Sequence, residues 1–368
     1  MRVLHIHSGN LYGGVETVIS TVARFRDACP KMESYFALCF EGRLSGELCA
    51  AGATVYALGR VRVSSPLSVR RVRLALGELL QRERFDIAVC HSAWSQAIFG
   101  RSVRAARLPL VLWLHAATDG RHWLERWARR TPPDAVICNS RFTAATLPRL
   151  YPNVHAEVIY CPVAPPPSVS PDEKTRVREE LNTPENATVI IQVSRMEPGK
   201  GQAMHLKALS HLRDISHWVC WIVGGSQSED ERSYEVELKA EAQRLGITTR
   251  VRFTGQRRDV PRLLAAADIY CQPNVSPDSF GLTFAEALHA RLPVVTTAIG
   301  GALEIVDASC GLLVSVGDEH GLAVALRSLL EDSALRANLG TNGPTHVMGL
   351  CDPKSRLQKL ENVLASLA

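Results

Sequence analysis

The chain has 368 residues, of which 46% are hydrophobic and 6% are aromatic. A chain of this length is too long for one ordinary hydrophobic core and fits two α/β domains. No segment contains the roughly 20 consecutive apolar residues that a membrane-spanning helix requires. The first residues also lack the long apolar run and the cleavage site of a signal peptide. We therefore expect a cytoplasmic protein.

The net charge is +5, and it is unevenly distributed. Residues 1–165 contain 21 Lys and Arg against 12 Asp and Glu, whereas the rest of the chain contains 21 against 25. The excess consists of arginines in residues 60–84, 101–107 and 121–130. They form either a basic face for an anionic membrane or a phosphorylated substrate, or a solvated helix surface. Nucleic acid is not expected as a partner, because no aromatic platform accompanies the arginines.

The ten cysteines include no C-x-x-C pair, and several, such as Cys90 and Cys271, lie inside apolar runs. A thiol within a strand behaves as a small hydrophobic side chain, and disulfide frameworks are typical of small secreted chains. We expect reduced, structural cysteines and no metal site.

The first half of the chain alternates short apolar runs with segments of helical periodicity, which predicts a parallel, doubly wound sheet. The expected strands are Val3–His7, Ser34–Phe40, Thr54–Leu58, Ile87–His91, Leu110–His115 and Ala135–Asn139, and the expected helices are Glu16–Arg26, Val69–Arg82 and Arg141–Leu150.

A proline-rich segment, residues 161–171, contains five prolines and predicts a semi-rigid connector between two domains. We place the domains at residues 1–164 and 165–350, with residues 351–368 as a closing helix that packs back toward the first domain. The second half repeats the α/β alternation, with strands expected at Val189–Val193, Val219–Val223, Val251–Thr254, Ile269–Gln272, Val294–Thr297 and Gly311–Val314, and helices at Gln202–Leu212, Glu235–Leu245, Val260–Ala266, Leu282–His289, His320–Leu330 and Lys354–Leu367. Two Rossmann-like domains of this kind bind ligands at the carboxyl ends of their strands, so we expect a cleft between them.

Two glycine-containing loops follow the first predicted strand of each domain. In the loop Gly9–Glu16, Gly13 and Gly14 allow backbone amides to approach a ligand at a helix N-terminus, although a tight structural turn explains them equally well. In the loop Ser194–Gly201, Arg195 and Lys200 flank a Pro-Gly turn, an arrangement suited to a diphosphate. The loop is not a P-loop, because G-x-x-x-x-G-K-[ST] is absent.

Two further loops follow later strands of the second domain. In Ser276–Glu286, Gly281 precedes a helix whose first amides, at Leu282 and Thr283, can face a phosphate. Glu286 lies about one turn further along, and Asp278 comes before the turn. Such carboxylates also occur simply as partners of a helix dipole. The fourth loop, Ile299–Glu304, repeats a Gly-Gly-x-x-Glu pattern.

The order Gly-Gly-x-Glu, R-x-x-x-x-K-G, acid-x7-Glu and P-V-V-x-x-x-x-G-G-x-x-E resembles the retaining glycosyltransferases of the GT-B fold, family 4 type (glycosyl transferases group 1), over nearly the whole chain. The resemblance implies transfer of a sugar from a UDP- or GDP-linked donor, without a cofactor or metal, to a glycan or lipid-linked acceptor in the synthesis of cell-surface polysaccharide or glycoconjugate. The positive charge of the first half of the chain predicts a peripheral position on the inner membrane face. The site residues that the resemblance implies are Arg195 and Lys200 for the diphosphate, Glu286 for the ribose, Phe280, Gly281, Leu282 and Thr283 for the phosphate, Gly255 beside the nucleobase, Asp278 and His115 at the transferred sugar, and Gly13 and Gly14 closing over the donor from the first domain.

One position departs from the family pattern, since the first acid of the acid-x7-Glu motif is usually Glu and is here Asp278. The shorter side chain has to lie closer to the sugar or reach it through water. We expect retained activity because Arg195, Lys200 and Glu286 are present. Two alternatives stay open: a GT-B-like sugar-nucleotide epimerase, and a non-catalytic sugar-nucleotide-binding protein.

Overall fold

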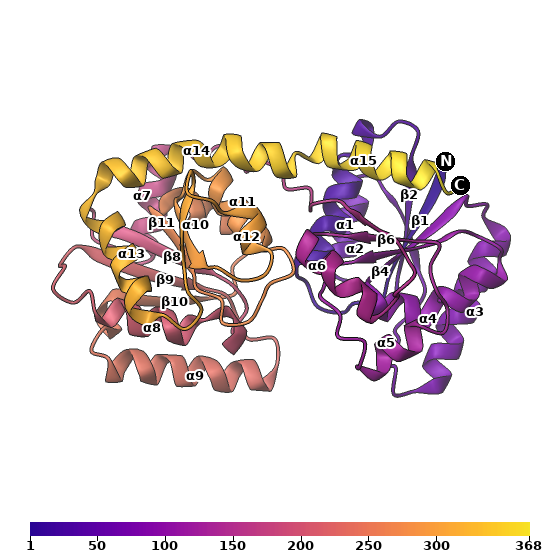
Figure 1. Ribbon diagram of the computed structural model, residues 1–368, viewed down its shortest axis with the longest axis horizontal. Helices are drawn as coiled ribbons and strands as arrows, with labels where there is room; N and C mark the ends of the chain where they lie inside the picture. Colours follow the sequence, from indigo (N-terminus) through magenta and orange to yellow (C-terminus); the bar gives the residue numbers. More distant parts are fainter. The chain divides into compact units, whose positions relative to one another are not determined.

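The computed structural model describes all 368 residues, which divide into two compact units. The first unit consists of Met1–Val163 together with Cys351–Ala368, and the second consists of Ala164–Leu350. The boundary lies in the proline-rich segment, where residues 161–170 form neither helix nor strand. Each unit contains its own parallel sheet (Figure 1). No helix has both the length and the apolar composition needed to cross a membrane.

The sheet of the first unit has seven parallel strands in the order β3-β2-β1-β4-β5-β6-β7. They are β1 (Arg2–His7), β2 (Glu33–Leu38), β3 (Thr54–Ala57), β4 (Ile87–His91), β5 (Leu110–Leu114), β6 (Ala135–Cys138) and β7 (Ala156–Val158). The helices of this unit are α1 (Gly14–Arg24), η1 (Arg26–Ala28), α2 (Arg43–Ala50), α3 (Pro66–Arg82), α4 (Ser92–Ala105), α5 (Trp123–Ala128), α6 (Arg141–Thr146), η2 (Leu147–Arg149) and α15 (Pro353–Ala365).

Strands β4 and β5 are buried at every residue, as expected for a parallel sheet that is covered on both faces. Leu4 and Ile6 of β1 pack with residues of α3 and α4 in one core cluster. Because side chains alternate along a strand, His5 and His7 lie on the opposite face of the sheet.

Helix α15 belongs to the first unit, although about 190 residues separate it from the rest of that unit. Its Glu361 carboxylate accepts a hydrogen bond of 2.7 Å from the backbone N–H of Lys31. The ammonium of Lys359 donates to the carbonyl of Val158 at 2.8 Å. These contacts attach the C-terminal helix to the segment between η1 and β2 and to the end of β7, and Figure 1 shows α15 lying along the first unit.

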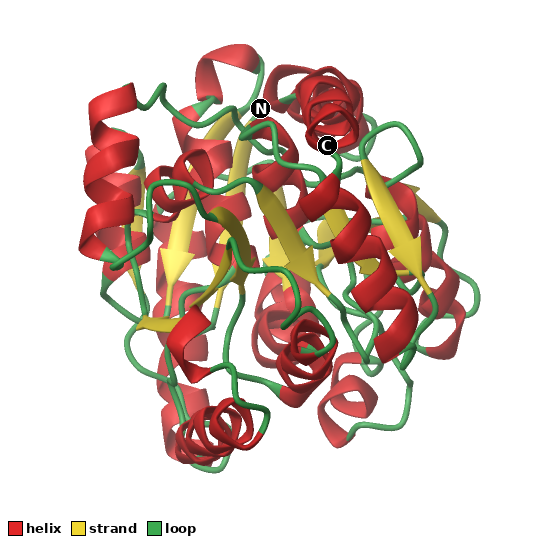
Figure 2. Ribbon diagram, turned by 90° about the vertical axis from the view of Figure 1, so that its left-hand side faces the viewer, coloured by secondary structure: helices red, strands yellow, loops and turns green.

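The sheet of the second unit has six parallel strands in the order β10-β9-β8-β11-β12-β13. They are β8 (Thr188–Val193), β9 (Trp218–Val223), β10 (Val251–Gly255), β11 (Ile269–Gln272), β12 (Val294–Thr297) and β13 (Gly311–Val314). Helices cover this sheet (Figure 2), and they are α7 (Pro171–Glu180), η3 (Pro198–Lys200), α8 (Gln202–Ser210), α9 (Glu229–Arg244), η4 (Thr248–Arg250), α10 (Val260–Ala266), α11 (Leu282–His289), α12 (Ala302–Ile305), α13 (Glu319–Glu331) and α14 (Ser333–Cys351).

The structure confirms the predicted fold class of two Rossmann-like, doubly wound sheets. In each sheet the strand order reverses at one place, between β1 and β4 in the first unit and between β8 and β11 in the second. Ligands of open α/β sheets bind outside the carboxyl ends of the strands at such a reversal. The predicted loops after β1, β8 and β11 therefore lie where this rule places a site.

Several elements differ from the sequence prediction. The strand expected to reach Phe40 ends at Leu38, and the strand expected to include His115 ends at Leu114. Helices α2, α4, α5, α7, α12 and α14 and strand β7 were not predicted. Helix α14 contains Pro344 and three glycines, which disfavour a helix. One of these glycines, Gly340, is required because a Cβ there would lie 2.3 Å from the carbonyl oxygen of Arg291.

Candidate functional site

Glycine lets the loops at the carboxyl edge of the second sheet approach one another closely. Gly201 has φ +71°, and a Cβ there would lie 1.8 Å from the carbonyl oxygen of Pro273. Gly300 has φ +63°, and a Cβ there would lie 2.5 Å from the carbonyl oxygen of Asp278. A side chain at either position would separate the loops that follow β8, β11 and β12. These contacts bring the predicted motifs of the second unit together.

Lys200 and Asp278, which are 78 residues apart in sequence, form an ion pair between Nζ and Oδ1. The other carboxylate oxygen of Asp278 accepts hydrogen bonds from Asn274 Nδ2 at 2.9 Å and from Gln272 Nε2 at 3.3 Å. The Lys200 and Asp278 side chains remain 24% and 20% exposed. The aspartate is therefore held on both oxygens by the protein while part of its surface stays open.

The backbone of Lys200 is fixed through a buried glutamine and a buried histidine. Gln192 Nε2 donates to the carbonyl of Lys200 at 2.8 Å, and its Oε1 lies 2.8 Å from His205 Nδ1. Burial lowers the pKa of His205 to about 3. The neutral ring therefore donates from Nδ1 to the glutamine oxygen, which sets the orientation of the amide.

The guanidinium of Arg195 lies between two carboxylates. It pairs with the buried Glu231 near the start of α9 and, at 2.9 Å, with Glu197 of its own loop. Gln202 Nε2 donates to the carbonyl of Arg195 at 2.8 Å. The Nε–H of Arg195 is buried and has no hydrogen-bond partner in the protein. The arginine is thus oriented by acids and retains a donor for a further acceptor.

Helix α11 begins next to Asp278, with Gly281 as its N-cap at φ +100°. The Leu282 and Thr283 backbone amides lie in the first turn, where N–H groups lack acceptors within the helix. Phe280, just before the cap, is buried. Burial raises the pKa of Glu286, in the second turn, to about 7. A carboxyl group that titrates near neutrality at a helix start is a candidate for a functional site.

Gly255 ends β10 at the same edge of the sheet and accepts a hydrogen bond of 3.0 Å on its carbonyl from the N–H of Gly224. In the loop that follows, Arg257 binds Asp259 at 2.8 Å and also pairs with Glu180. These two carboxylates raise the pKa of Arg257. The loop is held by one ion pair within it and by a second one to the end of α7.

The glycines of the first unit are held by Glu16. One oxygen of this carboxylate accepts the Gly13 N–H at 2.8 Å, and the other lies 2.7 Å from His7 Nε2. Gly13 caps α1, and Gly14 is its first residue. The Gly13–Gly14 turn is therefore tied to the end of β1.

His115 directly follows β5 and is buried, and burial lowers its pKa to about 3. Its Nε2 lies 3.0 Å from Nδ1 of His91, the last residue of β4. The sequence prediction missed His5, His7 and His91. The signal that could have revealed them is a histidine at or next to the carboxyl end of three strands, β1, β4 and β5, which the sheet places side by side.

Nine of the predicted residues lie in strand ends, loops or helix starts at the carboxyl edge of the second sheet: Arg195, Lys200, Gly255, Asp278, Phe280, Gly281, Leu282, Thr283 and Glu286. Gly13, Gly14 and His115 lie at the carboxyl edge of the first sheet. The prediction missed the residues that hold the second-unit group in place, namely Gln192, Glu231, Gln272 and Asn274. None of these belongs to a glycine-rich motif.

Asp307, Cys310 and His346 bring possible metal-ligating atoms within 4.8 Å of one another. His346 Nε2 lies 2.8 Å from the carbonyl of Ile305, and Asp307 accepts the Ser309 N–H at 2.9 Å. These contacts explain the group as an anchor of α14 on the loop before β13.

Two family models match the chain. The model described as Glycosyltransferase Family 4 matches residues 12–165, and the model described as Glycosyl transferases group 1 matches residues 173–346. The chain belongs to the family 4 type of glycosyltransferases. The two matches together include most of both units, and the structure confirms the GT-B fold.

Individual relatives agree with this membership. The chain is 29% identical over 205 residues to a GDP-mannose-dependent monoacylated alpha-(1-6)-phosphatidylinositol monomannoside mannosyltransferase of Corynebacterium glutamicum, a match that spans 54% of this chain and 52% of that protein. It is 25% identical over 346 residues to the lipopolysaccharide core biosynthesis glycosyltransferase LpsD of Rhizobium meliloti, covering 93% and 92% of the two chains. The structure of Anabaena HepE in complex with UDP and glucose superimposes with a TM-score of 0.86 at 25% identity over the full length of both chains. Several of the curated relatives are matched over about half of their length or less.

Proposed function

We propose that the protein transfers a sugar from a nucleoside-diphosphate sugar to an acceptor hydroxyl. The observation that supports this most is the group formed by Lys200, Asp278 and the start of α11, with Glu286 one turn further along. A cation and free helix amides suit a diphosphate, and carboxylates suit hydroxyl groups of ribose and sugar. One relative is named for its use of GDP-mannose, and the HepE structure was solved with UDP and glucose. Both support the same class of donor.

In the proposed reaction, the bond between the anomeric carbon and the diphosphate breaks while the acceptor oxygen bonds to that carbon. Negative charge develops on the leaving diphosphate, and Lys200, the Nε–H of Arg195 and the α11 amides stabilise it electrostatically. These groups supply positive charge without a metal ion. The leaving phosphate oxygen takes the acceptor proton on the same face, which gives retention of configuration.

Two carboxylates orient the donor in this proposal. Asp278 is fixed by Lys200 and Asn274 and binds hydroxyls of the transferred sugar through its open side. Glu286 binds the ribose hydroxyls as a carboxylate, and its pKa of about 7 leaves it about half ionised near neutral pH. His115 contacts the transferred sugar.

The relatives named for phosphatidylinositol mannoside and lipopolysaccharide core synthesis support a lipid-linked or glycan acceptor and a role in cell-surface glycoconjugates. The surface of the first unit supports a peripheral position on an anionic membrane. Large apolar side chains are exposed on α3, α4 and α5: Leu67 at 78%, Leu74 at 57%, Trp94 at 44% and Trp123 at 47%. Exposed apolar groups beside cations are typical of surfaces that bind anionic lipid.

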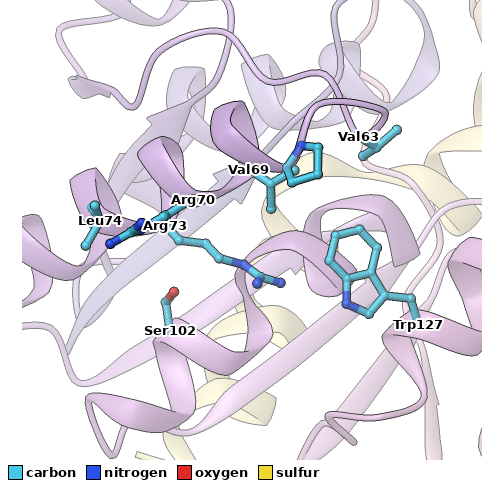
Figure 3. A pocket seen from close by; sticks show the side chains of 8 residues that line it. Val63, Val69, Arg70, Arg73, Leu74, Ser102 and Trp127 are labelled. Carbon is cyan, nitrogen blue, oxygen red and sulfur yellow. The ribbon is translucent and has the colours of Figure 1, made fainter.

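A hollow of about 500 Å³ lies between α3, α4 and α5 and is lined by both apolar and cationic side chains (Figure 3). The guanidinium of Arg73 extends toward the Trp127 ring, 5.3 Å from its centroid, and donates to the carbonyl of Ile98 at 2.6 Å. No carboxylate lies within ion-pair distance of Arg73 or of Arg70, which also lines the hollow. Burial is the main cause that lowers the pKa of Arg73. We propose that this hollow receives the phosphate and upper acyl segment of an anionic phospholipid.

Donor binding is tested with Lys200→Met, using UDP-glucose and GDP-mannose in calorimetric titrations and turnover assays. The control is Lys207→Met, which removes a lysine of α8 that pairs with Glu319. We expect at least a tenfold loss of affinity for the true donor in Lys200→Met only. Equal binding by both variants would show that the diphosphate is bound elsewhere.

Product analysis tests the finer parts of the proposal. The one-bond coupling between C1 and H1 of the transferred sugar reports retention or inversion, and turnover in excess EDTA reports metal independence. Donor incubated without acceptor yields an epimer if the protein is an epimerase. Inverted product, or an epimer, contradicts the proposed reaction.

Membrane binding is tested by flotation with vesicles of phosphatidylcholine, with and without phosphatidylglycerol. The double variant Leu67→Glu, Leu74→Glu changes the proposed surface, and Val236→Glu is the control because Val236 is 67% exposed on α9 of the second unit. We expect wild type and control to bind only anionic vesicles and the double variant to lose binding. Equal flotation of all three rejects this surface.

A further inference from the structure

Three adjacent strands of the first sheet carry a hydrogen-bonded row of histidines. His5 Nδ1 lies 3.0 Å from His91 Nε2, and His91 Nδ1 lies 3.0 Å from His115 Nε2. His5 pairs in register with Val89, two residues before His91, so the two histidines share one face of the sheet. We call His5, His91 and His115 the histidine row.

All three rings are neutral at physiological pH. His5 is 1% exposed, His91 is fully buried, and His115 is 7% exposed. Burial lowers the pKa of His5 and His115 to about 3, and burial together with the neighbouring histidines lowers the pKa of His91 well below its usual value. A neutral imidazole carries one N–H and one unprotonated nitrogen.

Three neutral imidazoles carry three N–H protons, and these protons can be arranged along the histidine row in only two ways. Each of the two hydrogen bonds uses one N–H, so the third N–H belongs to an end of the row, either His5 Nε2 or His115 Nδ1. His5 Nε2 is buried without a hydrogen-bond partner. A buried N–H without an acceptor is rare and costs about 1–3 kcal/mol. The third proton is therefore on His115 Nδ1, and every ring of the row donates from Nδ1.

The His5 end of the histidine row offers no path by which a proton could reach solvent. The His5 ring stacks on Phe36 at a centroid distance of 5.2 Å, and Trp113 stacks on both His91 and His115 at 5.3 and 5.4 Å. Apolar and aromatic contacts close the His5 end, so the row does not conduct protons to solvent. Its effect is to fix the tautomer and the ring plane of His115.

We propose that His5 and His91 are positioning residues that hold His115 neutral, with its proton on Nδ1. His115 then presents a hydrogen-bond donor rather than a cation or an acceptor at Nδ1. The consequence for catalysis rests on the proposed function, in which His115 contacts the transferred sugar. The tautomer assignment does not depend on that function.

The tautomers are read directly by long-range ¹H–¹⁵N NMR of protein labelled at histidine, with each signal assigned by the loss of one resonance in His5→Phe, His91→Phe and His115→Phe. We expect His5, His91 and His115 all in the Nδ1–H form, which is the reverse of the form that free neutral histidine favours. We expect none of them to titrate between pH 5 and pH 8. An Nε2–H signal from His115 overturns the proposal, and this measurement on the wild type remains decisive even if a variant does not fold.

Turnover measurements distinguish a positioning role of His91 from a role in packing alone. His91→Phe keeps an aromatic ring but removes both shared hydrogen bonds, and we expect kcat to fall roughly tenfold or more with the donor Kd unchanged, by analogy with other partners that orient a functional histidine. Trp113→Phe is the matched control because Trp113 stacks on the row without bonding to it, and its kcat stays near wild type. If His115→Phe abolishes turnover while His91→Phe leaves kcat intact, the positioning role is wrong. If His115→Phe leaves turnover intact, the role of His115 in the proposed function fails while the tautomer result stands.

Discussion

Replacing Glu286 by glutamine removes a carboxyl group whose pKa burial raises from 4.5 to about 7. If only the carboxylate binds the ribose hydroxyls, the competent fraction of the protein is about 9% at pH 6 and about 91% at pH 8 for a pKa of 7. The apparent Kd for a sugar nucleotide should therefore fall about tenfold between these two pH values. A sugar nucleotide is the appropriate probe because its diphosphate has no terminal group that titrates in this range.

The assay is calorimetric titration of UDP-glucose or GDP-mannose from pH 6 to pH 8 with wild type and Glu286→Gln. We expect the glutamine variant to bind weakly at every pH, because the amide accepts through one oxygen only. A wild-type Kd that does not change with pH, or a glutamine variant with the wild-type profile, would refute the assignment of Glu286 to the ribose.

Glu286→Gln should also change how the stability of the protein depends on pH. The folded protein binds the Glu286 proton more tightly than the unfolded chain does. The protonated carboxyl group therefore contributes its full stabilisation of the fold below pH 4.5, and this contribution is lost as pH rises to about 7. The shift corresponds to at most about 3 kcal/mol, an upper bound because the side chain is partly exposed. Urea unfolding of wild type and Glu286→Gln at pH 5 and pH 8 measures the difference, and equal pH dependence of the two proteins would contradict it.

Three further predictions follow from the contacts described. Asp278→Asn should lower kcat/KM at least tenfold while changing the unfolding free energy by less than about 1 kcal/mol, as for a partly exposed ion pair, and a large loss of stability would show a structural role instead. Gly201→Ala should destabilise the second unit by more than about 1 kcal/mol, because φ is +71° and a Cβ would meet Pro273, and an unchanged urea midpoint would refute this. Glu361→Ala should lower the stability of the first unit by about 1 kcal/mol through the loss of one hydrogen bond, whereas Glu319→Ala should leave the unfolding of the first unit unchanged, because Glu319 pairs with Lys207 within the second unit.

The sequence by itself determined every strand except β7, the Rossmann-like class and the positions of the glycine-rich loops. These features depend on patterns that are local, such as buried apolar runs, helical periodicity and glycine after a strand. The predicted strands begin and end within two residues of the observed ones, and β4 has the predicted bounds. The loops of Arg195 and Glu286 were found for the same reason, since each follows directly from a strand that the sequence reveals.

Only the tertiary structure decided which side chains meet. Asp278 pairs with Lys200 across 78 residues, and His91 joins two histidines from other strands, because strand order and register bring them together. Helix α14 forms in spite of Pro344, since packing against the rest of the second unit outweighs a weak local preference. Sequence patterns record the preferences of neighbouring residues, whereas ion pairs, tautomers and pKa values depend on distances between residues that are remote along the chain.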